Sequence, residues 1–275
     1  MKKISRRSFL AAAAVSAAAL ALTACGGASS SVASSVASSA AASSSASGSL
    51  ATVVAGKLTM ATNATFPPYE MTTDAGTIEG IDVDTAQAIA EKLGLELQID
   101  DMDFDAALLS VQQGKADMVM AGVTVTDERK AVMDFSDSYA TGIQSIIVPN
   151  GSDIASPDDL AGKKIGTQRG TTGYLYCSDD FGEDAVVAYD NGLTAVQALN
   201  NGQVDAVVID NEPAKAYVES NPGLKILDTS YAEEDYAIGM NKSNTALLEA
   251  VNAALEELKA DGTLQAIVDK YIKAE

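Results

Sequence analysis

Hydrophobic and polar residues alternate with two different periods along the first half of the chain, which predicts strands and helices in succession. Short apolar or strictly alternating runs predict strands at residues 57–62, 95–99 and 117–121. Apolar positions at helical spacing predict helices over 81–93 and 104–113, and a glycine follows each of them. Strands that alternate with helices are typical of βαβ units and a parallel sheet, so we predict an α/β fold.

The same arrangement returns later in the chain. Residues 111–122 align without a gap on residues 199–210, and each segment contains a helix end, a glycine, an aspartate and a buried strand. Further strands are predicted near residues 146–148, 160–167 and 236–240, and further helices from 174, after 211, over 245–258 and up to 271. We therefore predict two α/β lobes of similar construction rather than one continuous sheet.

The lobe boundaries follow from these elements. We place lobe 1 at residues 51–141 and 236–275 and lobe 2 at residues 142–235. The chain then passes between the lobes twice, near 140–145 and 231–237, and two crossings form a hinge.

Residues 1–25 have the pattern of an export signal. Four cations precede a short Ala-rich apolar segment, which is too short for a spanning helix. The ending Leu22-Thr23-Ala24-Cys25 resembles the bacterial lipoprotein cleavage site, so Cys25 is the candidate lipidation residue. Ser5–Leu10 resembles a twin-arginine signal, and export by that route or by the general pathway both remain open. An ordinary secretory peptide that contains a cysteine is the alternative reading of Cys25.

Composition narrows the function. Residues 26–50 consist of Ser, Ala, Gly and Val before Leu50, which is typical of a flexible tether. The formal net charge of −20 disfavours nucleic acid and anionic lipid as partners. The sequence contains no histidine, which excludes Ser–His and Cys–His nucleophile pairs and His-containing zinc sites. Residues 101–112 lack the glycine and the final acid of a calcium loop, so we predict no metal and no cofactor.

Candidate binding residues stand where predicted strands end. Thr126 is a good helix N-cap, and Arg129 in the following turn is a cation at the positive end of a helix dipole. It is either held there for an anion, with help from Thr124, or it is a surface arginine paired with Glu128 or Asp134. Asp210 ends a buried strand and needs a partner. Ligands of open α/β sheets bind at such strand ends, and this set of groups suits a zwitterion.

Six segments in order resemble the polar amino acid family of solute-binding proteins that serve ATP-driven importers. They are residues 61–70 (ATNATFPPYE), 80–84 (GIDVD), 121–129 (AGVTVTDER), 134–139 (DFSDSY), 170–173 (GTTG) and 204–208 (VDAVV). The resemblance covers about residues 57–273 and implies a periplasmic-binding-protein-like type II fold, with two α/β lobes joined by a two-strand hinge. It also implies a ligand enclosed between the lobes.

The resemblance implies a role for each matching residue. Arg129 would pair with the α-carboxylate of an amino acid, aided by the backbone at Thr124 and Thr172. Asp210 would hold the α-ammonium with the Thr124 hydroxyl and the Gly122 carbonyl. The ligand side chain would lie between two aromatic residues and face two amides at its tip, and these are Phe66, Phe104, Asn63 and Gln168. Both phenylalanines could instead be core aromatics.

The chain departs from the family at two positions that affect specificity. Members that take basic amino acids often carry an acid at the position of Asn63, so the neutral amide disfavours Lys or Arg as ligands. Arg169 stands where small or amide residues are frequent, and it meets either an acidic ligand side chain or solvent.

The resemblance predicts a non-enzymatic, monomeric protein that delivers a polar amino acid to ABC permease subunits. Acylated Cys25 would anchor it to the outer face of the cytoplasmic membrane. The alternative on the same fold is a cyclohexadienyl or arogenate dehydratase-like enzyme, for which Glu70 and Asp210 are the candidate acids. A receptor's sensory module is a third possibility, which the lack of a fused signalling domain disfavours.

Overall fold

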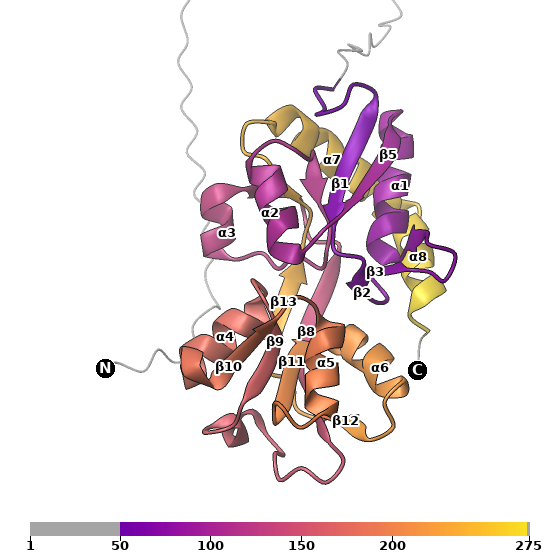
Figure 1. The fold of residues 1–275 in the computed structure, drawn as a ribbon. Coiled ribbons are helices and arrows are strands. Elements are labelled where there is room, and N and C mark those ends of the chain that lie inside the picture. Colours follow the sequence, from indigo (N-terminus) through magenta and orange to yellow (C-terminus); the bar gives the residue numbers. More distant parts are fainter. Residues whose placement is uncertain (1–49, 274–275) are drawn as a thin grey trace, which may run out of the picture. The chain divides into compact units, whose positions relative to one another are not determined.

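The computed structural model describes residues 50–273, and its two main sheets belong to two lobes joined by long strands (Figure 1). This confirms the predicted α/β fold with two lobes. The predicted signal peptide, Cys25 and the tether before Leu50 lie outside the described residues. No helix within residues 50–273 has both the length and the apolar character that crossing a membrane requires.

The first lobe contains a five-stranded sheet in the order β5-β1-β6-β14-β7. Its strands are β1 (Lys57–Thr62), β5 (Glu96–Asp101), β6 (Met118–Val119), β7 (Asp134–Phe135) and β14 (Gly239–Met240). Strand β1 pairs in parallel with β5 and β6, whereas β14 runs antiparallel to β6 and β7. The C-terminal part of the chain therefore returns to the first sheet.

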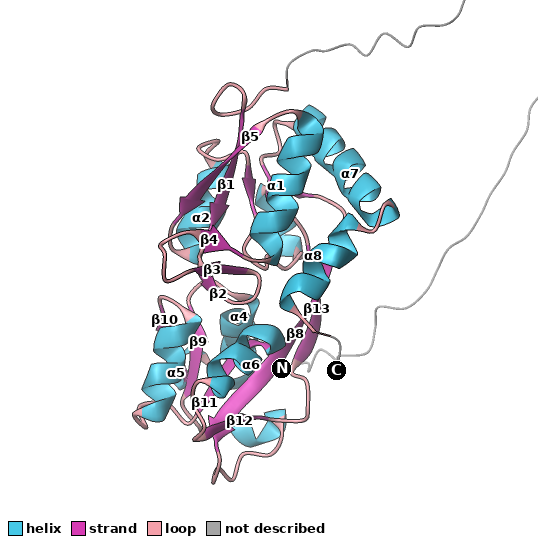
Figure 2. Ribbon diagram, turned by 90° about the vertical axis from the view of Figure 1, so that its right-hand side faces the viewer, coloured by secondary structure: helices cyan, strands magenta, loops and turns pink. Residues whose placement is uncertain are grey.

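Helices cover both faces of this sheet. They are α1 (Ile81–Leu93), α2 (Phe104–Gln112), α3 (Asp127–Val132), α7 (Thr245–Ala260) and α8 (Thr263–Tyr271). Helices α1, α7 and α8 lie together on one face, and α2 lies on the other (Figure 2). Because successive strand residues point to opposite faces, Leu58 and Met60 of β1 pack toward α1 and α7, and Ala61 packs toward α2.

The second lobe contains a sheet in the order β10-β9-β11-β8-β12, with β13 also paired to β8. Its elements are β8 (Ala140–Pro149), β9 (Ile165–Gln168), α4 (Thr172–Phe181), β10 (Val186–Tyr189), α5 (Gly192–Asn200), β11 (Ala206–Asp210), α6 (Asn211–Glu219), β12 (Leu224–Ile226) and β13 (Ala232–Tyr236). Strand β11 contributes to the hydrophobic clusters on both faces of this sheet. Val207 and Ile209 face α5 and α6, whereas Ala206 and Val208 face α4.

Strands β8 and β13 run antiparallel where the chain passes between the lobes. Their register pairs Ala140 with Tyr236 and Gln144 with Ala232.

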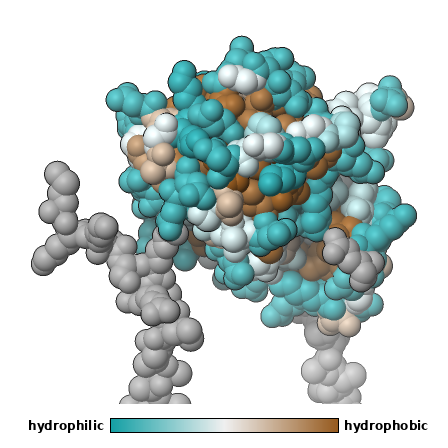
Figure 3. Space-filling model, turned by 90° about the horizontal axis from the view of Figure 1, so that it is seen from below, coloured by the Kyte–Doolittle hydropathy of each residue, from teal (hydrophilic) through white to brown (hydrophobic). Residues whose placement is uncertain are grey.

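At the surface, hydrophobic residues are visible between hydrophilic ones (Figure 3). The large hydrophobic side chains that are exposed are Val53, Val54, Leu109, Val132, Leu175 and Leu193.

Several element boundaries differ from the sequence prediction. The strand expected at 117–121 is confined to Met118–Val119. The strand expected at 236–240 is interrupted, because Tyr236 ends β13 and only Gly239–Met240 forms β14. Residues 157–160 form a 3₁₀ turn, so the strand expected from 160 begins at Ile165. The proline-containing loop near residue 66 contributes to a small separate sheet of β2 (Thr65–Phe66), β3 (Glu70–Thr72) and β4 (Ile78–Glu79). Apolar runs in the sequence predict well which residues are buried, but a strand is defined only where the backbone pairs with a neighbouring strand.

Candidate ligand-binding site

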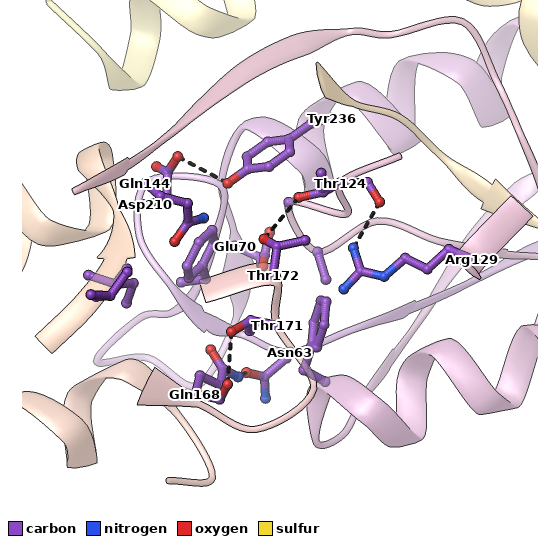
Figure 4. Close-up of a pocket in the computed structure, with 16 residues that line it drawn as sticks. Asn63, Glu70, Thr124, Arg129, Gln144, Gln168, Thr171, Thr172, Asp210 and Tyr236 are labelled. Atoms are coloured by element: carbon purple, nitrogen blue, oxygen red, sulfur yellow. Dashed lines mark hydrogen bonds between the residues drawn. The ribbon is translucent and has the colours of Figure 1, made fainter. Parts of the chain in front are cut away.

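A partly enclosed cleft between the two lobes brings together residues from distant parts of the sequence (Figure 4). Together with the open solvent at its mouth, it contains about 450 Å³ of space not filled by atoms. Its walls are formed by Asn63, Phe66, Glu70, Phe104, Ala121, Gly122, Thr124, Arg129, Gln144, Gln168, Thr171, Thr172, Val208, Ile209, Asp210 and Tyr236. All nine binding residues expected from the sequence line this one cleft.

Arg129 enters the cleft from the first lobe. Thr126 is the N-cap of α3 and its hydroxyl accepts a hydrogen bond from the Arg129 backbone N–H at 3.2 Å, which confirms the predicted cap. The guanidinium donates to the Thr124 carbonyl at 2.8 Å and to the Gly170 carbonyl of the second lobe at 3.1 Å. Its carbon lies 5.4 Å from the centroid of the Phe104 ring.

The arginine is therefore held in place and still has donors to spare. Only 8% of Arg129 is exposed, and burial lowers the pKa of its guanidinium. A guanidinium has five N–H donors and stays protonated in proteins, so two bonds to carbonyls leave capacity for a carboxylate. The alternative of a solvent-exposed surface arginine does not fit this burial.

Asp210 faces the cleft from the second lobe, at the end of β11. Its Oδ1 caps α6 by accepting from the Glu212 N–H at 3.0 Å. Its Oδ2 accepts from the Ile143 N–H at 2.9 Å and from the Tyr236 hydroxyl at 3.0 Å. Burial raises the pKa of Asp210 to about 6, although these three hydrogen bonds lower it. The ionised carboxylate is thus under-compensated, and a cation would stabilise it.

Thr124 connects the two lobes through its hydroxyl. It donates to Glu234 Oε2 at 2.9 Å and lies 3.5 Å from the Thr172 hydroxyl. Gln144 donates to the same Glu234 oxygen at 3.0 Å. Because the Thr124 proton is committed to Glu234, its oxygen retains lone pairs that can accept from a ligand donor.

Amides and aromatic rings form the opposite end of the cleft. The Gln168 side chain donates to the Asn63 side-chain oxygen at 2.9 Å across the lobe boundary, and Asn63 donates to the Met102 carbonyl at 2.9 Å. Phe104 is 5% exposed, and Phe66 packs against hydrophobic clusters of both lobes. Arg169 does not line the cleft, since it is directed to Asp190 at 3.8 Å with about half of its side chain exposed.

Gly122 allows the chain to approach the cleft closely. Its φ of +55° is a conformation that favours glycine, and a Cβ there would lie 2.8 Å from the Phe66 ring and 3.2 Å from the Tyr236 ring. Any side chain at this position would displace one of the aromatic walls.

Several residues of the cleft were not predicted as binding residues, namely Glu70, Ala121, Gln144, Thr171, Val208, Ile209 and Tyr236. Gln144 and Tyr236 come from the crossing strands β8 and β13. Side chains alternate between the two faces of β13, which places Glu234 and Tyr236 on the same buried face. An acid two residues before a tyrosine in a predicted strand is the sequence signal that could have identified these two residues. Among residues 50–273, no group of acids and cysteines is arranged to hold a metal ion.

Comparisons with known proteins agree with this geometry. The sequence model of the bacterial extracellular solute-binding proteins, family 3, matches residues 58–274. The probable histidine-binding protein of Neisseria gonorrhoeae is 34% identical over 96% of this chain and 95% of its own length. The L-cystine-binding protein TcyJ of Escherichia coli K12 is 34% identical over 80% of this chain and 84% of its own.

Solved structures show the same fold. An ancestral arginine-binding protein bound to arginine is 45% identical with a TM-score of 0.76, and the match covers 79% of this chain and 98% of that one. These relatives are named as binding proteins, which supports the predicted binding role rather than catalysis. The chain belongs to the bacterial extracellular solute-binding proteins of family 3.

Proposed function

We propose that the chain captures a free polar amino acid between its lobes and delivers it to the permease subunits of an ABC importer. The observation that carries this proposal is that Arg129 of the first lobe and Asp210 of the second line a single cleft. A guanidinium and a carboxylate at separate walls match the α-carboxylate and α-ammonium of an amino acid.

The neighbouring groups support the same orientation. At the ammonium end, Asp210 has an acceptor site left beside its three bonds, and the Thr124 oxygen has free lone pairs. The Gly122 carbonyl and the backbone at Thr172 complete the proposed set. The ligand side chain would lie between Phe66 and Phe104 with its tip at Asn63 and Gln168.

Relatives in the family are named for several amino acids, including histidine, cystine, arginine and glutamine. One of them is named as an ABC transporter glutamine-binding protein. Glu70 and Asp210, the two candidates for the acid that a dehydratase would require, do line the cleft, but the named relatives are binding proteins. We therefore retain transport as the function.

A thermal-shift screen of the purified protein against the twenty protein amino acids and cystine tests capture. A ligand at 100 times its Kd stabilises the folded state by about 2.7 kcal/mol, which is a readily measured shift. We expect Arg129→Ala to remove the shift produced by the best ligand. A screen in which no amino acid shifts the melting temperature would refute the proposal.

The proposed membrane anchor is a separate question. We infer acylation of Cys25 from the Leu22-Thr23-Ala24-Cys25 pattern, and we infer a monomer on the outer face of the cytoplasmic membrane. Cells fed labelled palmitate should incorporate label into the wild-type protein and not into Cys25→Ser. Equal release of both proteins into the medium would contradict the anchor.

A further inference from the structure

Two acidic side chains lie buried beneath the ammonium end of the cleft. Glu70 of β3 and Asp82 of α1 are both 0% exposed. Among the described residues, no hydrogen-bond partner lies at ordinary distance from either Glu70 oxygen or from Asp82 Oδ1. Unpaired buried carboxylates are costly, so an arrangement that keeps both of them needs a physical explanation.

Local backbone contacts force the two acids together. The Asp82 N–H donates to the Tyr69 carbonyl at 2.9 Å, and the Ile81 N–H donates to the Pro68 carbonyl at 3.0 Å. The start of α1 is thereby fixed against the residues immediately before Glu70. Gly80 permits this approach, because a Cβ there would lie 2.1 Å from the Tyr69 carbonyl oxygen.

The acids connect directly to the cleft. Asp82 Oδ2 accepts from the Gly122 N–H at 3.0 Å, and Glu70 itself borders the cavity. Gly122 in turn packs against Phe66 and Tyr236, and the Tyr236 hydroxyl donates to Asp210. A short chain of contacts thus runs from the buried acids to the proposed ammonium site.

We propose that Glu70 and Asp82 share one proton and together hold the Gly122 turn in place at the cleft wall. The protonated Glu70 carboxyl donates to Asp82, which leaves Asp82 Oδ2 free to accept from the Gly122 N–H. Both are positioning residues that act through Gly122. Their effect on binding rests on the proposed function, whereas the shared proton does not.

The electrostatic surroundings agree with a shared proton. Burial raises the pKa of Glu70 well above its ordinary value, and the charge of the nearby Asp82 raises it further. Burial also raises the pKa of Asp82, to about 6. The other main groups that act on Glu70 are Asp101 of β5 and Asp210 of β11, and the phenols of Tyr69, Tyr139 and Tyr217 are close enough to be affected by it. Burial and the nearby carboxylates disfavour a second ionised carboxylate, whereas the Tyr139 phenol acts in the opposite sense and lowers the pKa of Asp82.

The first experiment measures stability without any ligand. A group whose pKa is raised by folding loses its favourable contribution as pH rises toward the folded pKa. Glu70→Gln replaces the protonated acid with a neutral donor of the same shape. Between pH 5 and 7 we expect the unfolding equilibrium constant of the wild type to rise relative to that of Glu70→Gln, by up to about tenfold per pH unit, which is the limit for one proton bound only by the folded state.

Two further variants sharpen this measurement. Asp82→Asn leaves Glu70 as a single acid that can ionise beside an amide donor. The unfolding equilibrium constant of this variant should therefore also depend less strongly on pH than that of the wild type. Glu79→Gln changes an exposed acid of the neighbouring strand β4 and should follow the wild type. If the ratio of the unfolding equilibrium constants of the wild type and Glu70→Gln stays constant from pH 5 to 7, the proposal of a shared proton is wrong.

The second experiment tests positioning, with the amino acid that gives the largest thermal shift as the probe. We expect Glu70→Gln to bind within about threefold of the wild type, because its amide can still donate to Asp82. Glu70→Ala should bind at least about tenfold more weakly, because Asp82 loses its donor. Equal affinities of the alanine and glutamine variants would refute the positioning role, while absence of binding by the wild type would refute only the proposed function.

Discussion

Lowering the pH from 7 to 5 should weaken amino acid binding through Asp210. Burial raises the pKa of this carboxyl to about 6 in the unliganded protein. About nine-tenths of the molecules then carry the ionised form at pH 7 and about one-tenth at pH 5. If only the ionised form holds the ammonium, the apparent Kd rises about tenfold over this range, because affinity scales with the competent fraction.

The sign follows from what the ligand does to the carboxyl. An ammonium close to Asp210 favours the charged form and lowers its pKa, so binding at acidic pH must release a proton. We expect about 0.9 protons released per ligand at pH 5 and about 0.1 at pH 7. Isothermal titration calorimetry in buffers of different ionisation enthalpy measures this number together with Kd. Histidine should not be used as the probe, because its own side chain titrates in the same range.

Variants separate Asp210 from other acids near the cleft. Asp210→Asn keeps a side chain that can cap α6, but it removes the charge, so we expect a loss of about 2 kcal/mol or more and no proton release. Asp82 is a second buried carboxyl whose pKa is raised, and Asp82→Asn should retain the loss of affinity at low pH. The reasoning fails if Kd is the same at pH 7 and 5 while circular dichroism shows a folded protein, or if Asp210→Asn binds like the wild type.

Three other substitutions test two residues of the cleft wall and one hydrogen bond between the lobes. Arg129→Lys keeps the charge but loses the planar fork that reaches the Thr124 and Gly170 carbonyls, so calorimetry should show binding at least about tenfold weaker; unchanged affinity would mean that the carboxylate binds elsewhere. Tyr217→Phe removes the hydrogen bond from Tyr217 to the Thr65 carbonyl across the lobes, worth about 0.5–1.5 kcal/mol. It should weaken binding about two- to tenfold and enlarge the unliganded protein in small-angle scattering, and an unchanged radius would argue against a closing role. Asn63→Asp places an acid beside Gln168 and should raise the affinity for arginine relative to glutamine by about tenfold, measured by competition; a shift in the other direction would place the ligand tip elsewhere.

The residues that the sequence predicted best are those whose role depends on local structure. Thr126 caps α3 as predicted, because an N-cap is set by the next three residues. Gly122 and Asp210 stand at corresponding places in the aligned segments 111–122 and 199–210, and both line the cleft. The strand before Asp210 ends there as predicted, whereas the strand before Gly122 ends at Val119. Each of these signals lies within a dozen residues of sequence.

Residues whose role depends on long-range pairing were not predicted. Gln144 and Thr124 both donate to Glu234, and Gln144 lies close to Glu234 because β8 and β13 pair antiparallel at the lobe crossing. The Glu70 and Asp82 pair is created by backbone contacts between the Pro68–Tyr69 turn and the start of α1. Strands β6 and β14 are two residues long, so their pairing is determined by neighbouring strands more than by their own sequence pattern.

The hydrogen bonds of Arg129 show that the binding site is complete only when both lobes contribute to it. Its guanidinium donates to Thr124 of its own lobe and to Gly170 of the other, so its full hydrogen bonding exists only when the lobes are together. A ligand carboxylate that binds the remaining N–H groups therefore joins an arginine whose position already depends on closure. A ligand that binds this assembled site more tightly than the open one shifts the population toward the closed form by that difference. Capture and closure are then one equilibrium, and a substitution at Gly170 or Tyr217 should alter affinity without touching the ligand side chain.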